Sequence, residues 1–254
     1  MTRGADTDRP NGHAAPHLLR AVSSKALVIT TALAVAVVGV FSYLIVSRER
    51  HPAQIRATGI PASVSTQLAD LMGLSPLPNK TAPDFTLTDQ HGQTLSLAEL
   101  SGRAVVLEFM DPSCVDICPI VSQEFNDAYH DLGTAASKAV FIAVNVNPFH
   151  VDVASVAAYT AAHQLDTVPS WHFLTGPVSS LQAVWRDYNV DVSAPSVTAE
   201  VVHTSVVYFI DPSGHERYVA FPMIDHSAAG RPYLPTGPLS QWGLGIAAVT
   251  RSLS

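Results

Sequence analysis

Two cysteines dominate the chemistry that this sequence could perform. Cys114 and Cys118 are the only cysteines among 254 residues, and they lie in the stretch DPSCVDICP, which runs from Asp111 to Pro119. If this stretch begins a helix, thiols four residues apart lie one turn apart on the same helical face, so their sulfurs can meet at one ion or bond to each other. The pair therefore predicts a soft-metal site or a reversible dithiol/disulfide site.

A plain structural disulfide is the alternative, because disulfides are common outside the cytoplasm. A bridge across three intervening residues closes a very short loop and constrains the unfolded chain little, so we favour a functional pair. A helix N-terminus would lower the pKa of a thiol and favour the thiolate that binds metals or attacks disulfides. Asp116, between the cysteines, either supplies a negative charge to that helix N-terminus or orients a ligand or meets a partner.

Alternating strand and helix patterns surround the two cysteines. The apolar stretch from Ala104 to Met110 predicts a buried strand that leads into them, and apolar residues at helical spacing follow up to Gly133. Further strands are predicted at 139–146, 171–174, 204–210 and 216–221, and further helices at 151–165, 178–188 and 239–253. This order predicts an α/β fold of the thioredoxin-like type, with a mixed central sheet flanked by helices. The cysteines then lie at the carboxyl end of a strand, where open α/β sheets bind ligands.

The N-terminal part of the chain predicts a membrane anchor. Residues 26–46 are 21 consecutive uncharged residues, enough to cross a hydrocarbon core of about 30 Å as a helix. A cleaved signal peptide is the alternative, but the apolar stretch is longer than is usual for one, and the Ser47-Arg48-Glu49-Arg50 that follows is no small-residue cleavage site. We therefore expect a disordered cytoplasmic tail at 1–25, a transmembrane anchor at 26–46, a linker at 47–80 and a folded domain at 81–254. The protein would be a single-pass protein of the cell membrane, with its soluble domain extracytoplasmic.

Charge excludes one class of partner. Residues 80–254 contain seven Lys and Arg against seventeen Asp and Glu, a balance of −10. Nucleic-acid binding needs a basic surface to meet the phosphates, so no nucleic-acid partner is expected. Metal cations or a basic patch on a partner protein are compatible with this balance.

Several motifs occur together and in a fixed order along the chain. After the cysteine stretch come WHFLTG from Trp171, VWRDY from Val184 and HTSVVYFIDPSG from His203. With these motifs, from about Ala82 to Phe221, the chain resembles the SCO/SenC family of copper-delivery proteins, which also have a single anchor helix. Two departures stand out: the family usually has proline where this chain has Val115, and an acidic, Arg-containing segment where this chain has residues 147–152.

The resemblance implies a third ligand for a copper ion bound by the cysteines. His203 matches the ligand position of the family, and it also opens the strand at 204–210, which in this architecture should lie beside the cysteine stretch. His150 and His172 are the alternatives among the eleven histidines. Two thiolates and one imidazole are soft enough for Cu(I), while the nitrogen and one open position can also serve Cu(II).

Three functions remain open at this stage. The leading one is a copper chaperone that binds copper through Cys114, Cys118 and His203, and the resemblance implies that its partner is the copper-receiving subunit of a terminal oxidase. The alternative is a thioredoxin-like thiol-disulfide oxidoreductase in which Cys114 and Cys118 form the redox-active pair, although such enzymes carry Cys-x-x-Cys and usually a proline where this chain has Val202. A copper- or redox-sensing module is the third.

Overall fold

The structure is a computed structural model that describes residues 59–254. The tail predicted at 1–25 and the transmembrane helix predicted at 26–46 lie outside the described residues. Between residues 59 and 254, the helices are too short or too polar to cross a bilayer.

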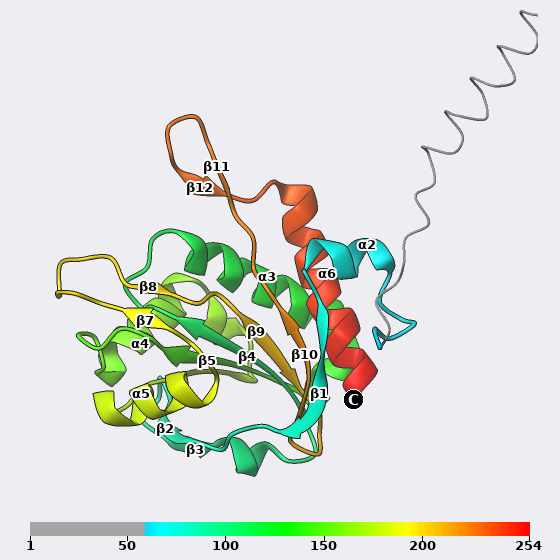
Figure 1. Ribbon diagram of the computed structural model, residues 1–254, viewed down its shortest axis with the longest axis horizontal. Helices are drawn as coiled ribbons and strands as arrows, with labels where there is room; N and C mark the ends of the chain where they lie inside the picture. Colours follow the sequence, from blue (N-terminus) through cyan, green and yellow to red (C-terminus); the bar gives the residue numbers. More distant parts are fainter. Residues whose placement is uncertain (1–58) are drawn as a thin grey trace, which may run out of the picture. The chain divides into compact units, whose positions relative to one another are not determined.

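A six-stranded mixed sheet forms the centre of the domain, in the order β1-β10-β9-β4-β5-β6 (Figure 1). Its parallel part consists of β4 (Ala104–Met110), β5 (Ala139–Asn145) and β6 (Trp171–Leu174). Its antiparallel part consists of β9 (Val207–Ile210), β10 (His215–Ala220) and β1 (Ser75–Thr81). The mixed α/β architecture predicted from the alternating patterns is therefore confirmed.

Each face of the sheet has its own apolar core. One core, the α3-side core, is covered by α2 (Thr66–Leu71), α3 (Ile117–Leu132), α4 (Val153–Ala162) and α6 (Thr236–Leu253). The other, the α5-side core, is covered by α5 (Val178–Asp187), the 3-10 helix η1 (Leu97–Leu100) and the hairpin of β2 (Thr86–Thr88) and β3 (Thr94–Ser96). The alternation of side chains along β4 separates the two cores, since Val106 and Met110 belong to the first, and Val105 and Leu107 to the second.

Short elements complete the domain. They are η2 (Gly133–Lys138), η3 (Leu165–Thr167), the pair β7 (Val192–Ser193) and β8 (Val202–His203), and the pair β11 (Asp225–His226) and β12 (Pro232–Tyr233). Both pairs lie outside the central sheet, as separate antiparallel hairpins (Figure 1). The β11–β12 hairpin and the first turn of α6 occupy the segment after Met223.

Local sequence signals explain several boundaries. The side chain of Ser96 accepts the N–H of Glu99, whose carboxylate in turn accepts the N–H of Ser96, and together these bonds form a capping box at the start of η1. The turn between β9 and β10 is held by the Asp211 carboxylate, which accepts the N–H groups of Ser213 and His215. Gly214 in this turn has a φ of 77°, a conformation that favours glycine.

The folded domain begins earlier than residue 81. β1 pairs with β10 and lies at the edge of the central sheet, although its first six residues fall in the predicted linker. Ile60, Val64 and Met72 are buried in the α3-side core, and the short helix α2 also lies within the predicted linker. These apolar side chains cover the face of the sheet beside α6, so this part of the predicted linker is integral to the fold.

Candidate metal and thiol site

The segment after β4 contains both cysteines, and hydrogen bonds within it and to the loop after β5 hold it in place. The Asp111 carboxylate accepts the N–H of Ser113 at 2.8 Å and the side-chain N–H of Asn147 at 2.8 Å, while the Asp111 carbonyl accepts the N–H of Cys114 at 3.1 Å. Asn147 follows β5, the parallel neighbour of β4, so the two loops leave the same end of the sheet. Asp111, only 6% exposed, thereby ties the cysteine loop to the rigid sheet.

Cys114 lies outside the helix that the sequence predicted for both cysteines. α3 begins at Ile117, so Cys118 lies in its first turn and Cys114 in the turn before it. The Asp111 side chain accepts the N–H of Ser113 and so forms an Asx turn. Because such a turn competes with helix formation, α3 begins only after Cys114. The sulfurs nevertheless lie close together, because the N–H of Cys118 donates to the Cys114 sulfur at 3.5 Å.

The two thiols differ in acidity. A hydrogen bond from the Cys118 side chain, together with backbone N–H groups of Cys118 and Asp116, lowers the pKa of Cys114 to about 7. The pKa of Cys118 is raised well above its usual value, first because its side chain donates to Cys114 and second because it is buried. Cys114 is therefore the more nucleophilic and more accessible sulfur, and Cys118 is the protected one.

Asp116 occupies the N-cap position of α3, but its side chain makes no capping hydrogen bond. Its Oδ1 is buried and has no hydrogen-bond partner among the described residues. The neighbouring Val115, in the position where the resemblance would place proline, is 88% exposed. A role of Asp116 in orienting a ligand or meeting a partner therefore stays a proposal.

His203 lies on β8, which leads into β9, and β9 runs antiparallel to β4, so His203 enters at the end of the sheet where the cysteine loop leaves β4. Burial lowers the pKa of its imidazole, while the hydrogen bond with the Thr204 carbonyl and the charge of Asp111 act in the opposite direction. Its Nδ1 lies 3.0 Å from the carbonyl oxygen of Thr204, which it can reach as a donor. A proton on Nδ1 would leave Nε2 free as an acceptor or a metal ligand.

The alternative histidines lie on other elements. His172 lies on β6, and its Nδ1 is 3.3 Å from the Asp89 carboxylate on the β2–β3 hairpin. His150 lies in the loop after β5, where its carbonyl oxygen accepts the side-chain N–H of Asn145 at 2.8 Å. Across residues 59–254, no three His, Cys, Asp or Glu side chains are already grouped as a metal would need them. The structure thus brings Cys114 and Cys118 together and places His203 on a strand that enters at the same end of the sheet, and the ligand set stays a prediction.

The sequence reasoning did not single out two buried carboxyl groups beneath the cysteines. Glu108 on β4 is 1% exposed and Glu124 on α3 is fully buried, and burial raises the pKa of both well above its usual range. The charge of Glu124 raises the pKa of Glu108 further, and the charge of Glu108 contributes to the raised pKa of Cys118. One signal was available in the sequence, because Glu108 is the single charged residue in the apolar stretch at 104–110.

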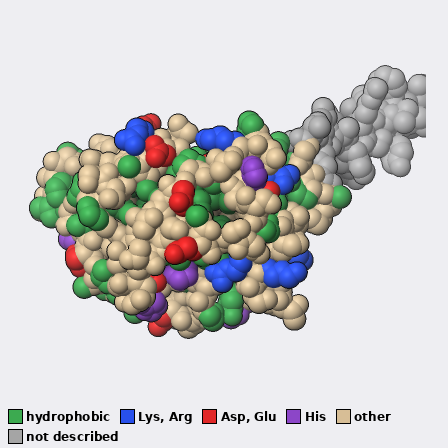
Figure 2. Space-filling model, turned by 90° about the horizontal axis from the view of Figure 1, so that it is seen from below, with side chains coloured by type: hydrophobic (Ala, Val, Ile, Leu, Met, Phe, Trp, Pro, Cys, Tyr) green, Lys and Arg blue, Asp and Glu red, His purple; other side chains and the backbone are tan. Residues whose placement is uncertain are grey.

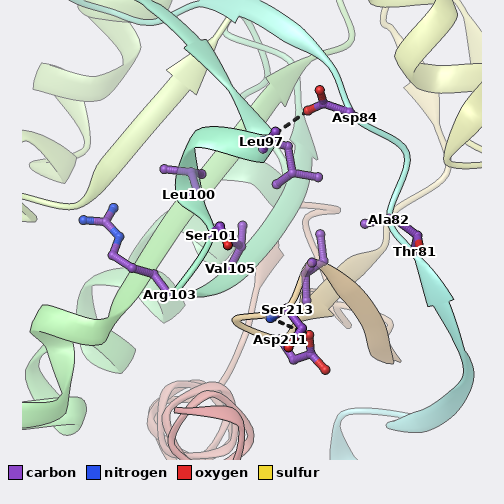
Figure 3. Close-up of a pocket in the computed structure, with 13 residues that line it drawn as sticks. Thr81, Ala82, Asp84, Leu97, Leu100, Ser101, Arg103, Val105, Asp211 and Ser213 are labelled. Carbon is purple, nitrogen blue, oxygen red and sulfur yellow. Dashed lines mark hydrogen bonds between the residues drawn. The ribbon is translucent and has the colours of Figure 1, made fainter.

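A cavity of about 270 Å³ lies elsewhere, near the start of β4 and the β9–β10 turn (Figure 3). Its two carboxylates are already bonded: Asp84 accepts the N–H of Ala98 at 3.0 Å, and Asp211 accepts the N–H of Ser213 at 2.9 Å. The side chain of Arg103 extends away from these carboxylates (Figure 3). The cavity therefore resembles a packing gap between η1 and the sheet, and the chemistry belongs to the cysteine loop.

Comparisons with known proteins agree with this arrangement. The model of the SCO1/SenC family matches residues 75–227. The SCO1 protein homolog of Bacillus subtilis is 26% identical over 138 residues, which cover 54% of this chain and 71% of that protein. The mitochondrial SCO2 homolog of Bos taurus is 30% identical over 139 residues, which cover 52% of this chain and 50% of that protein.

A solved structure shares the fold. ScoI of Bradyrhizobium japonicum, determined with copper bound, superposes with a TM-score of 0.53 at 22% sequence identity. The match covers 68% of this chain and 99% of the ScoI chain. At this level of identity the likeness supports the fold of the domain, while ligands and partners have to be argued from the residues.

Proposed function

Because the chain belongs to the SCO1/SenC family, we propose that it is a membrane-anchored, extracytoplasmic copper chaperone that assists assembly of the copper centre of a terminal oxidase. Cys114, Cys118 and His203 would hold the copper ion. The family membership, the copper bound to Bradyrhizobium japonicum ScoI and the paired thiols support this proposal. The anchor rests on the apolar stretch at 26–46.

The observation that carries the proposal is the pairing of two free thiols of unequal acidity after β4. Both cysteines are free, and the Cys114 sulfur already accepts the N–H of Cys118. The lowered pKa of His203 favours its neutral form, which is the form that binds metals. Two sulfurs and one nitrogen suit Cu(I) and leave a position through which a receiving protein can approach.

Copper would be cargo in this protein, passed on by exchange of ligands without any change in its oxidation state. Binding requires both thiols to lose their protons to solvent. The accessible sulfur of Cys114 would be the natural first point of exchange, because Cys118 is buried and its pKa is raised. Release to an acceptor would then return the protons to the thiols.

The test is a Cu(I) titration of the reduced, full-length chain, monitored by charge-transfer absorption and by equilibrium dialysis. We expect one copper ion per chain, and at least a hundredfold weaker binding in Cys114→Ser and Cys118→Ser, because thiolates are the soft ligands of the set. His203→Ala should weaken binding by about tenfold to a hundredfold and change the Cu(II) spectrum. His150→Ala and His172→Ala serve as matched controls. Wild-type chain that binds no stoichiometric copper, or a His203→Ala variant with an unchanged spectrum, would contradict the proposal.

The unequal acidity of the thiols favours a second candidate, a thiol-disulfide oxidoreductase. The Cys114 thiolate would attack a target disulfide and release one target thiolate. Cys118 would then lose its proton, attack the Cys114 sulfur and release the second target thiol, leaving a Cys114–Cys118 disulfide. In this reaction the target gains the two electrons that the cysteine pair loses.

The pH dependence of Cys114 alkylation tests this candidate. In wild-type chain the alkylation rate should rise through about pH 7, following the thiolate fraction of Cys114. In Cys118→Ala the midpoint should move upward, because the hydrogen bond that stabilises the thiolate is lost. Rapid turnover of a disulfide substrate that is unaffected by His203→Ala would favour the oxidoreductase over the chaperone, and a wild-type midpoint near the ordinary thiol value would argue against it.

A further inference from the structure

The exposed apolar side chains of the domain gather at one end of the sheet. Of the large hydrophobic residues exposed between residues 59 and 254, all except Leu244 lie in segments next to the carboxyl end of β4, where the cysteines are. We call six of these seven residues, all except Phe221, the apolar rim: Val115, Phe149, Val197, Val202, Met223 and Tyr233. Singly exposed hydrophobic residues are ordinary, but their concentration around one site marks an interaction surface.

The topology explains why these segments meet. Val115 belongs to the cysteine loop, and Phe149 to the loop after β5, whose Asn147 binds Asp111. β9 runs antiparallel to β4, so the β7–β8 hairpin that precedes it enters at the same end of the sheet. β10 runs antiparallel to β9, so the hairpin that follows it leaves at that end as well. β12 contacts α3, and the adjoining Leu234 packs against the same core as Cys114.

The charges around the rim restrict what can cover it. The segments that carry the rim, 111–116, 146–152, 194–206 and 221–235, contain five carboxylates, Asp111, Asp116, Asp152, Glu200 and Asp225, against one basic residue, Arg231. Asp152 and Glu200 are exposed. On the face seen from below, Lys and Arg side chains lie mainly in the right-hand half, whereas hydrophobic side chains are spread over the face, the left end included (Figure 2).

This combination disfavours two of the three possible occupants. An anionic bilayer surface attracts apolar groups flanked by Lys and Arg, and it repels carboxylates. A second copy of the chain would bring the same carboxylates against each other, and like charges across an interface oppose association. A protein with an apolar centre and a basic margin matches both the rim and its charges.

We propose that the apolar rim is the docking surface for the copper-receiving protein, which presents an apolar patch bordered by Lys or Arg around its own copper ligands. This inference rests on the proposed function and names the surface that function would use. Docking at the rim would bring the acceptor ligands to Cys114, the accessible sulfur, and would exclude water from the site during exchange. The carboxylates would speed association and set its orientation, while the apolar contacts would supply most of the affinity.

The probe is the copper-free, soluble copper-binding domain of the terminal-oxidase subunit from the same organism. Binding to the full-length, copper-loaded chain in nanodiscs of neutral lipid would be measured by calorimetry at low and at high salt. We expect Phe149→Ser together with Val202→Thr to weaken binding by about tenfold or more. The matched control is Leu244→Ser on α6, which is 47% exposed against 43% for Phe149 and should leave binding unchanged.

Charge reversal tests the other half of the proposal. Glu200→Lys should slow association and reduce its dependence on salt. Asp166→Lys is the control and should do neither, because η3 lies just before β6, at the end of the sheet opposite to the rim. The proposal is overturned if the rim variants bind the probe as well as Leu244→Ser does. It is equally overturned if wild-type chain binds phosphatidylglycerol vesicles or self-associates through the rim instead of binding the probe.

Copper titration of the same variants separates this inference from the proposed function. Phe149→Ser with Val202→Thr should bind Cu(I) with wild-type stoichiometry, because neither side chain is among the proposed ligands. A wild-type chain that binds copper but does not bind the probe would refute the rim and leave the chaperone intact. A wild-type chain that fails to bind copper would refute the chaperone itself.

Discussion

The two apolar cores of this domain treat buried polar groups differently. In the α5-side core, large polar side chains are bonded: the hydroxyl of Tyr188 donates to the Pro83 carbonyl at 2.8 Å, and the indole N–H of Trp185 donates to the Asn145 carbonyl at 2.9 Å. In the α3-side core, Glu108 Oε2, both Glu124 carboxyl oxygens and the indole N–H of Trp242 have no partner among the described residues. The cysteines belong to this second core: Cys118 is buried in it, and Cys114 packs against it.

This difference in hydrogen bonding distinguishes a core that serves stability from a core that lies at the candidate site. A buried polar group without a partner costs about 1–3 kcal/mol, and a buried charge costs more. The α5-side core avoids these costs and acts as a fixed support for β4 and its neighbours. The α3-side core retains two buried carboxyl groups, whose raised pKa favours the neutral form, and the charge of one of them, Glu108, acts on the protected thiol of Cys118.

The largest test of this comparison is the pH dependence of stability. The pKa of Glu108 is raised in the folded state, so its contribution to stability is fully present below the pKa of the unfolded chain and is lost as pH rises. The free energy of unfolding should therefore fall by up to about 1.4 kcal/mol per pH unit for each such group above about pH 4.3. Glu108→Gln, which keeps the shape without the charge, should reduce this slope and be more stable than wild type at about pH 8.

Urea unfolding at about pH 5 and about pH 8 measures this effect. Glu200→Gln, on the exposed connection between β7 and β8, is the matched control and should leave the slope unchanged. A wild-type chain whose stability rises steadily over this range, or a Glu108→Gln variant with the wild-type slope, would show that the two cores do not differ in the way described.

Much of the architecture followed from periodicity. The helix predicted at 178–188 is α5 at Val178–Asp187, and the strand predicted at 171–174 is β6 with the same bounds. Both are continuous amphipathic or apolar segments, in which local pattern and tertiary burial agree. The cysteine pair was equally visible, because its chemistry depends on residue type and short spacing alone.

The features that the sequence did not predict depend mostly on contacts that the local pattern does not show. β1 contains Pro76 and Pro78 and exposes most of its residues, so its pairing with β10 left no alternating pattern to read. Cys114 was placed in the helix because the sequence does not show that the Asp111 side chain fixes a turn before it. The pair of Glu108 and Glu124 spans two elements, and only the packing of α3 on β4 makes both carboxyl groups buried neighbours.

The smallest test compares one tyrosine hydroxyl from each core. The hydroxyl of Tyr159 lies 2.9 Å from that of Ser122, which donates to the Cys118 carbonyl at 2.9 Å, so this chain of bonds ends at the first turn of α3. Tyr188→Phe and Tyr159→Phe each remove one buried hydrogen bond and should each lower the free energy of unfolding by about 1 kcal/mol. Only Tyr159→Phe should also change the alkylation rate of Cys114, by less than about tenfold, because a shift of this turn alters the bond between the two thiols. Urea unfolding and alkylation kinetics on the same samples measure both effects. Equal alkylation rates in the two variants would mean that the hydrogen bonds of the α3-side core have no special effect on the cysteines.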